Sequence, residues 1–202
     1  MSANQAVLMF TPSAKGTTGG LCMSRRHRDT AAGRSNNGAY IDWKHGNAFD
    51  ENRYMKRLSR AQRIGAPDFA VIPDIVGGGL RSLSYSMAWL ERLPIEWPWY
   101  LALQDGMTEN DIVPVVNRVG GLFLGGTDRF KREAESWAQF AREHSKPFHF
   151  ARAGTEPKIK QAMRIGADSL DSSLPLWNFR RLHRMEYLVT EWPHAEPRLV
   201  NV

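Results

Sequence analysis

The feature that most constrains this chain is a repeated unit in which a helix ends at a glycine, a short apolar strand follows, and an acidic residue comes next. Residues 164–173 read Arg-Ile-Gly-Ala-Asp-Ser-Leu-Asp-Ser-Ser, and residues 63–74 repeat the arrangement, so Asp171 and Asp74 each follow an apolar run. Such units, recurring roughly every 25 to 35 residues, are typical of parallel strands joined by helices. The pattern predicts two acids at the same end of a parallel sheet; capping of the next helix or turn is the alternative for each Asp.

Strand and helix signals alternate along most of the chain. The expected strands are residues 7–10, 39–43, 69–73, 99–103, 121–124, 148–151 and 169–170. Helices are expected to begin after the N-cap residues Asp50, Thr108, Thr127 and Thr155, each followed by an acid. This alternation predicts an α/β fold, a TIM-like (β/α) barrel in a single domain. The barrel is expected to be trimmed or incomplete, because a full one typically needs about 250 residues and this chain has 202. A dinucleotide-binding fold is disfavoured, since Gly77-Gly78-Gly79 lacks the required spacing.

The single cysteine, Cys22, excludes an intramolecular disulfide and a zinc site made of several cysteines from this chain. The sequence has no apolar run of the length that a membrane span needs, and its first residues do not resemble a signal peptide. These observations predict a soluble, cytoplasmic protein without membrane contact.

Basic residues exceed acidic ones, 27 to 21, which gives a formal charge of +6 and favours a polyanionic partner. Residues 12–36 are predicted to form a long basic loop, and residues 174–202 a C-terminal helical tail. The residues predicted to contact nucleic-acid phosphates are Arg25, Arg26, Arg28, Arg152, Arg180, Arg181 and Arg184. For the clusters at 25–28 and 180–184, a solvated charged face is the alternative interpretation.

Polar residues and glycines follow the predicted strands, where a β/α barrel carries its chemistry. Guanine presents N–H donors beside a carbonyl oxygen, so a pocket for it needs a carboxylate, an amide and close approach of the backbone. Asp74, Gln104, Gly125 and Gly126 supply these groups, and Tyr40 supplies a ring for stacking. His149 is interpreted as a hydrogen-bonded histidine on a strand, with substrate contact as the alternative.

Three runs, in this order, resemble those of the tRNA-guanine transglycosylase superfamily: residues 103–106 (Leu-Gln-Asp-Gly), 120–126 (Gly-Gly-Leu-Phe-Leu-Gly-Gly) and 166–171 (Gly-Ala-Asp-Ser-Leu-Asp). The likeness covers roughly residues 34–173. It is strongest to the DNA-acting branch, the phage-type DpdA proteins that insert 7-deazaguanines into DNA. The resemblance implies that Asp171 is the catalytic nucleophile. It also implies that Asp74 and Gln104 recognise the base, that Gly125 lines the pocket, and that Tyr40 stands where the family has a stacking aromatic.

The resemblance further implies a pentosyltransferase that exchanges a flipped or unstacked guanine in DNA for a 7-deazaguanine such as preQ0, in the host cytoplasm if phage-encoded. Two departures from the family stand out. The DNA-acting sequences usually have Asp-Asn-Gly-Ala-aromatic, whereas this chain has Asn36 and Asn37 at the first two of these base-binding places, and Asn36 cannot take a proton as an Asp does. The tRNA enzymes carry a Cys-Cys-Cys-His zinc site that is missing here, so we expect neither zinc nor another cofactor.

Two alternatives remain open from the sequence. One is a catalytically silent nucleic-acid-binding relative, which Asn36 favours. The other is an unrelated β/α-barrel enzyme acting on a small phosphorylated sugar, with Gly125-Gly126-Thr127 as a phosphate cup at a helix N-terminus.

Overall fold

The computed structural model describes residues 7–10, 21–24, 39–63, 67–93, 96–172 and 179–190. The chain divides into two compact units: a central unit, residues 27–148, and a terminal unit, residues 1–26 together with 149–202. Both units combine strands with helices, so the fold class is mixed α/β, as predicted. Among the described residues, no helix has both the length and the apolar character needed to cross a membrane.

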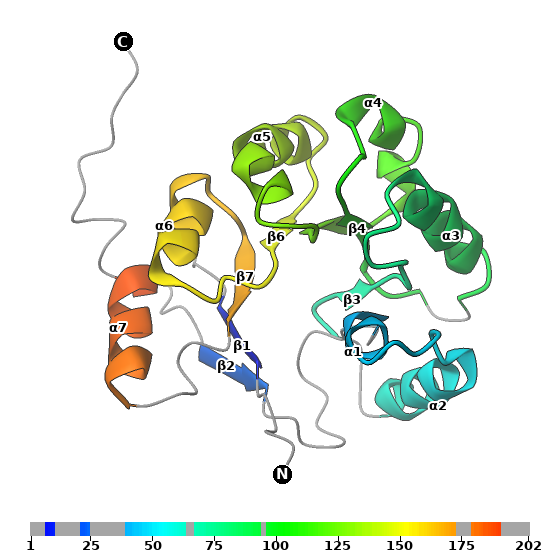
Figure 1. The fold of residues 1–202 in the computed structure, drawn as a ribbon, viewed down its shortest axis with the longest axis horizontal. Helices are drawn as coiled ribbons and strands as arrows, with labels where there is room; N and C mark the ends of the chain where they lie inside the picture. The colour runs from blue at the N-terminus through cyan, green and yellow to red at the C-terminus, as the bar shows by residue number, and fades with distance from the viewer. Residues whose placement is uncertain are drawn as a thin grey trace. The chain divides into compact units, whose positions relative to one another are not determined.

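The central unit is a run of βα units preceded by two helices. Its elements are α1 (Ala39–Lys44), α2 (Glu51–Gln62), β3 (Ala70–Val71), α3 (Leu80–Leu90), β4 (Trp99–Leu103), α4 (Glu109–Ile112), the 3₁₀ helix η1 (Val116–Arg118), β5 (Gly121–Leu124), the 3₁₀ helix η2 (Phe130–Glu133) and α5 (Ala134–Glu143). Strand β4 pairs in parallel with β3 on one side and with β5 on the other. All five residues of β4 are buried, as expected for a parallel strand covered on both faces. Figure 1 shows α3 beside β4.

Helix α2 is fixed to α3 by buried aromatic side chains. It begins at Asp50, whose side chain accepts the Arg53 backbone N–H at 2.9 Å, so this predicted N-cap is confirmed. Tyr54 and Leu58 lie one turn apart on the same side of α2, and both are buried. The Tyr54 ring meets Trp89 of α3 edge-on, with centroids 5.6 Å apart, and burial raises the pKa of the Tyr54 hydroxyl. Burial of these rings therefore decides which side of α2 faces solvent.

In the terminal unit, strands from the N-terminal and C-terminal parts of the chain pair with one another. Its elements are β1 (Val7–Phe10), β2 (Leu21–Ser24), β6 (Phe148–Phe150, whose first residue is the last of the central unit), α6 (Glu156–Arg164), β7 (Ser169–Ser172) and α7 (Phe179–Thr190). The strand order is β2-β1-β7-β6. Strands β6 and β7 are parallel, whereas β1 runs antiparallel to both β7 and β2.

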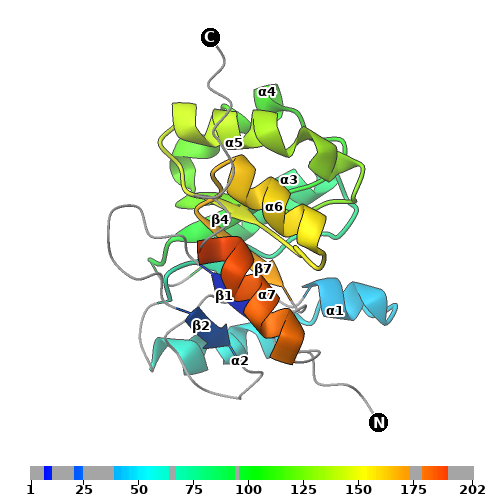
Figure 2. The same cartoon turned by 90° about the vertical axis from the view of Figure 1, so that its left-hand side faces the viewer.

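Helix α6 ends at a glycine, as the sequence predicts. Gly166 has a φ of +70°, which an L-residue rarely adopts, and its N–H donates to the Met163 carbonyl at 3.1 Å. The next amide, that of Ala167, donates to the Ala162 carbonyl at 3.0 Å, and the chain then enters β7. Helices α6 and α7 lie side by side in both views (Figures 1 and 2).

Strands β3, β4 and β5 of the central unit are parallel, as are β6 and β7 of the terminal unit, and helices alternate with these strands along the chain, a pattern consistent with a partial β/α barrel. The described residues do not form a complete eight-stranded barrel. The predicted bounds of β4 and β5 are confirmed residue by residue.

Two predicted elements are corrected. Residues 39–43 form a helix, α1, and not a strand, because Ala39 and Asp42, three residues apart, share a buried side and Asp42 is paired with Arg53. The predicted loop 12–36 contains the strand β2, and its other residues lie outside the described ones. The predicted helical tail contains α7, whereas residues 174–178 and 191–202 lie outside the described part of the chain.

Candidate functional site

In the central unit, three loops leave the carboxyl ends of β3, β4 and β5, which lie at the same edge because these strands are parallel. The β3 loop carries Asp74, the β4 loop begins with Gln104 and Asp105, and the β5 loop is Gly125-Gly126-Thr127. The structure brings together Asp74 and Gln104, the two residues predicted to recognise a base, since the Gln104 amide donates to the Asp74 carboxylate.

Gln104 connects the β3 loop to α3 with every polar group of its side chain. Its Oε1 accepts the Gly77 N–H at 2.6 Å, and its Nε2 donates both to Asp74 and to the Ser82 hydroxyl, the latter at 3.3 Å. The residue is 3% exposed, so these bonds are made away from water. Gln104 therefore holds Asp74 in place, a role that the sequence prediction of base recognition did not include.

Asp105 links the β4 loop to the β5 loop by hydrogen bonds. Its carboxylate accepts the backbone N–H of Thr127 at 2.7 Å and also the Thr127 hydroxyl. Burial alone raises the pKa of Asp105, but these hydrogen bonds outweigh burial and hold that pKa below its ordinary value. The proposed phosphate cup is thereby disfavoured, because an anion of the protein already takes the Thr127 donors.

The two glycines of the β5 loop have different reasons for being glycine. Gly125 donates its N–H to the Leu103 carbonyl at 3.0 Å, so it extends the pairing of β5 with β4 and this N–H is not directed at a ligand. Gly126 has a φ of +67°, and a Cβ there would lie 2.8 Å from an Asp105 carboxylate oxygen. Both predicted pocket residues thus lie at the predicted strand end, close to backbone and carboxylate groups.

In the terminal unit, Asp171 lies on β7 and its carboxylate is held by two donors. Asp171 Oδ1 is 2.9 Å from His149 Nε2 and accepts the Arg152 backbone N–H at 3.0 Å. The side chain is 14% exposed, so it is mostly shielded and still reaches the surface. An ionised carboxylate only accepts hydrogen bonds, so His149 carries its hydrogen on Nε2 in that state. These two donors fix the position of one carboxylate oxygen.

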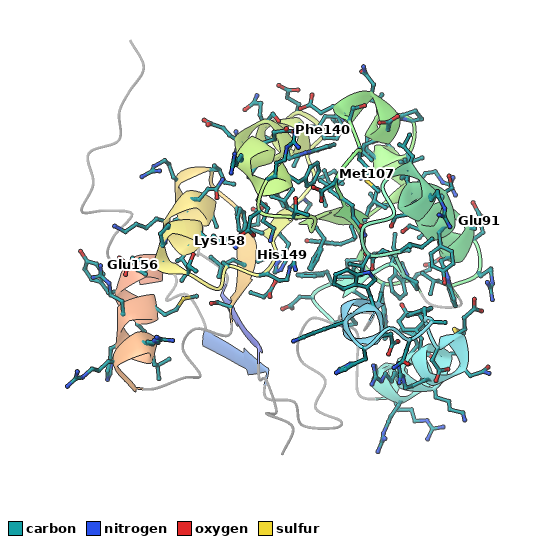
Figure 3. All side chains as sticks on the ribbon, viewed as in Figure 1. Glu91, Met107, Phe140, His149, Glu156 and Lys158 are labelled. Atoms are coloured by element: carbon teal, nitrogen blue, oxygen red, sulfur yellow. The ribbon has the colours of Figure 1, made fainter. Side chains whose placement is uncertain are left out.

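His149 is itself held from behind by Ser169. Its Nδ1 lies 2.7 Å from the Ser169 hydroxyl, and the ring is fully buried. Figure 3 labels His149 next to β7. Register explains the contact: His149 pairs with Ser169 across the parallel strands, and Asp171 lies two residues further on the same face of β7. A Ser-His-Asp set suggests a serine hydrolase. In such an enzyme the serine hydroxyl contacts the histidine Nε2 and is accessible to substrate, whereas Ser169 contacts Nδ1 and is 5% exposed. Ser169 and His149 therefore support Asp171.

Arg152 contributes its backbone to this arrangement. Its φ is +54°, a left-handed conformation that is uncommon for a residue with a side chain. In that conformation its N–H points to Asp171, and its side chain is exposed at the end of β6. An exposed guanidinium at that strand end is compatible with the predicted phosphate contact.

The remaining predicted residues fall into three groups. Asn36, Asn37, Arg25, Arg26 and Arg28 lie outside the described residues. Tyr40 lies in helix α1, and its side chain is not described. Arg180 and Arg181 are exposed on α7, whereas Arg184 forms a two-pronged ion pair with Glu156 of α6, so a phosphate would compete with Glu156 for it.

The supporting residues were harder to predict than the acids. Asp171 and Asp74 were identified from the sequence, whereas Ser169 and Ser82 were given no role and Thr127 was expected only as an N-cap and as part of a phosphate cup. Ser169 could have been identified only from the register of β6 against β7, because that register pairs it with His149.

The described residues contain no group of three or more His, Cys, Asp or Glu side chains placed to hold a metal ion. Comparisons of this chain with models of protein families, with curated proteins and with solved structures gave no match.

Proposed function

We propose that this chain is a DNA-guanine transglycosylase that exchanges guanine in DNA for a 7-deazaguanine base such as preQ0. Asp171 is the nucleophile, and Asp74 with Gln104 recognises the base. The complete fold that this function implies is a TIM-like barrel. The likeness of the three sequence runs to the transglycosylase superfamily supports the proposal.

The observation that carries it is the way in which Asp171 is held. A nucleophilic carboxylate must present an oxygen to an electrophilic carbon in a fixed direction, and fixing it beforehand removes an entropic part of the barrier. His149 and the Arg152 amide hold Oδ1 at 2.9 and 3.0 Å, and the carboxylate stays 14% exposed. A carboxylate that only capped a turn would not require a fully buried histidine behind it.

The proposed exchange has two steps. Asp171 attacks C1′ of the deoxynucleotide, the C1′–N9 bond breaks, and the bonding electrons leave with guanine. The incoming 7-deazaguanine then attacks C1′ through N9, and the bond to Asp171 breaks, so the configuration at C1′ is retained. One proton passes in total from N9 of the incoming base to the leaving base. The reaction requires the guanine to be unstacked, because C1′ cannot be approached inside an intact duplex.

Base recognition rests on the Gln104 and Asp74 pair. A carboxylate accepts the N–H donors that guanine presents and adenine lacks at the same place. Gln104, which is 3% exposed, fixes the carboxylate, so Asp74 does not need to reorient when a base arrives. A base with the wrong donors leaves such a fixed carboxylate unsatisfied, which is a strong basis for selection.

Asp171→Asn tests the proposal. Asn keeps an oxygen to accept from His149 and Arg152, so the fold should survive, but the amide is a poor nucleophile. With guanine-containing DNA and no incoming base, the parent protein should give a denaturation-resistant protein–DNA band on a gel. Asp171→Asn should give no band, and base exchange should fall by at least about a thousandfold.

The exposed residue Asp168, directly before β7, provides the matched control. Asp168→Asn should retain both the adduct and the exchange. An adduct that persists in Asp171→Asn would overturn the assignment of the nucleophile. DNA binding by the parent without adduct or exchange would instead identify the silent nucleic-acid-binding relative that Asn36 favours.

A further inference from the structure

One side of helix α2 carries a row of basic residues that the catalytic proposal does not use. We name it the α2 basic face; its members are Arg53, Lys56, Arg57 and Arg60 of the helix and Arg63 at its C-cap, all exposed. Spacings of three and four residues put these side chains on one side of a helix. From Arg53 to Arg63 the helix rises about 15 Å along its axis. The face is therefore an elongated strip of positive charge.

The charge of this face is only partly balanced within the protein. Arg53 is paired with Asp42 and lies 4.0 Å from Asp50, and Glu51 is directed to Arg92 of α3 at 3.1 Å. Among the described residues, no acidic side chain forms an ion pair with Lys56 or Arg57. The face therefore keeps a positive charge that an external anion can neutralise.

The opposite side of α2 is committed to the core. Tyr54 is 4% and Leu58 is 2% exposed, and Tyr54 packs edge-on against Trp89. A helix that lies in a membrane surface needs an exposed apolar side to insert between lipids. Because α2 has buried that side, its basic face fits a hydrated polyanion better than a lipid surface.

We propose that the α2 basic face binds the phosphate backbone of DNA. One strand of a duplex carries a charge about every 3.4 Å along the axis, so a row about 15 Å long spans about four phosphates. Arginine forks and a lysine ammonium suit phosphate oxygens, and such contacts carry no sequence preference. The inference rests on the proposed function only in the choice of DNA, since the face has no part in the chemistry at Asp171.

The test removes three charges from the face. Lys56→Gln, Arg57→Gln and Arg60→Gln are combined in one variant, because glutamine favours helix and leaves the buried side of α2 unchanged. A matched control combines Arg132→Gln, Arg142→Gln and Arg164→Gln, which removes the same number of charges from other exposed positions. Binding to a short fluorescent DNA duplex is measured by anisotropy over a range of salt concentrations.

The α2 variant should bind at least about tenfold more weakly at low salt. Its slope of log affinity against log salt should be shallower than the parent's by about 2.7, from about 0.9 for each lost phosphate contact. The control should keep the slope of the parent. Equal slopes for the α2 variant and the parent would overturn the inference, as would binding of the face to phosphatidylserine vesicles but not to DNA.

The two proposals fail separately. If the α2 variant loses DNA binding but the parent forms no adduct through Asp171, the inference stands and the transglycosylase proposal fails. If the parent forms the adduct and the α2 variant binds DNA as the parent does, the catalytic proposal stands and the inference fails.

Discussion

Replacing His149 tests the structural support of Asp171 most directly. His149→Phe keeps an aromatic ring of similar size but removes both ring nitrogens. Asp171 then loses its 2.9 Å partner, and the Ser169 hydroxyl loses the ring nitrogen at 2.7 Å. Arg152 continues to donate its backbone N–H to Asp171.

The expected cost follows from these two bonds. A hydrogen bond to a charged group contributes about 1.5–3 kcal/mol, and a buried hydroxyl left without a partner costs about 1–3 kcal/mol. The free energy of unfolding should therefore fall by about 2.5–6 kcal/mol, against a typical total of about 5–15 kcal/mol. Asp171 is partly exposed and regains some water, which places the expected value toward the lower end of this range.

Urea unfolding and base exchange measure the two consequences. His149→Gln keeps an N–H donor for Asp171, so it should lose less stability and recover part of the turnover. If His149 positions the nucleophile, kcat should fall in His149→Phe by about a hundredfold while the KM for DNA changes little. His144→Phe, at the half-buried C-cap of α5, is the matched control and should behave as the parent does. A loss of less than about 1 kcal/mol with unchanged kcat in His149→Phe would refute the reasoning.

Two further predictions concern the central unit. Gln104→Leu removes three hydrogen bonds from a residue that is 3% exposed, so the free energy of unfolding in urea should fall by about 2–4 kcal/mol. Base exchange by this variant should lose its preference for guanine. The control Gln139→Leu, at an exposed position, should show neither change. For Asp105→Asn, the direction of the pH dependence follows from the lowered pKa of Asp105 in the folded protein. The ionised carboxylate contributes stability above the ordinary pKa of 3.8, and this contribution is lost as the pH falls through the lowered pKa. Unfolding curves of parent and variant should thus differ by about 1–2 kcal/mol near neutral pH and converge in acid; a difference that does not shrink in acid would contradict the assignment of Thr127 as the cause.

Strands β4 and β5 could be predicted to the residue, because each is a continuous apolar run bounded by proline, glycine or a polar residue. Helix α1 could not, because six residues are too few to distinguish a helical period from alternation, and the deciding contact, Asp42 with Arg53, comes from the next helix. Strand β2 was missed for a related reason. Its sequence, Leu-Cys-Met-Ser, has little intrinsic strand preference, and pairing with β1 makes it a strand.

The acids of the candidate site could be predicted from sequence, whereas their partners depended on register and loop conformation. Asp171 and Asp74 each follow an apolar run, and the carboxyl end of such a strand is where a β/α fold carries its chemistry. The sequence does not reveal that Gln104 binds the β3 loop, because 27 residues separate Gln104 from Gly77. It also does not reveal that Asp105 accepts the hydrogen bonds of the Thr127 amide and hydroxyl, which disfavours the phosphate-cup interpretation.

The contacts of four aspartates separate their roles. Asp105 gives its carboxylate to the Thr127 amide and hydroxyl, which joins two loops and lowers its pKa, so it serves the fold. Asp168 is exposed ahead of β7, and Asp74 is held by the amide of Gln104. Asp171 differs from all three, because a fully buried histidine and a left-handed backbone position both direct donors at one of its oxygens. A left-handed residue with a side chain costs about 1–2 kcal/mol, and a protein that retains this cost beside a carboxylate gains a fixed direction for it. That is the property a nucleophile at C1′ needs, and a turn-capping aspartate does not need it.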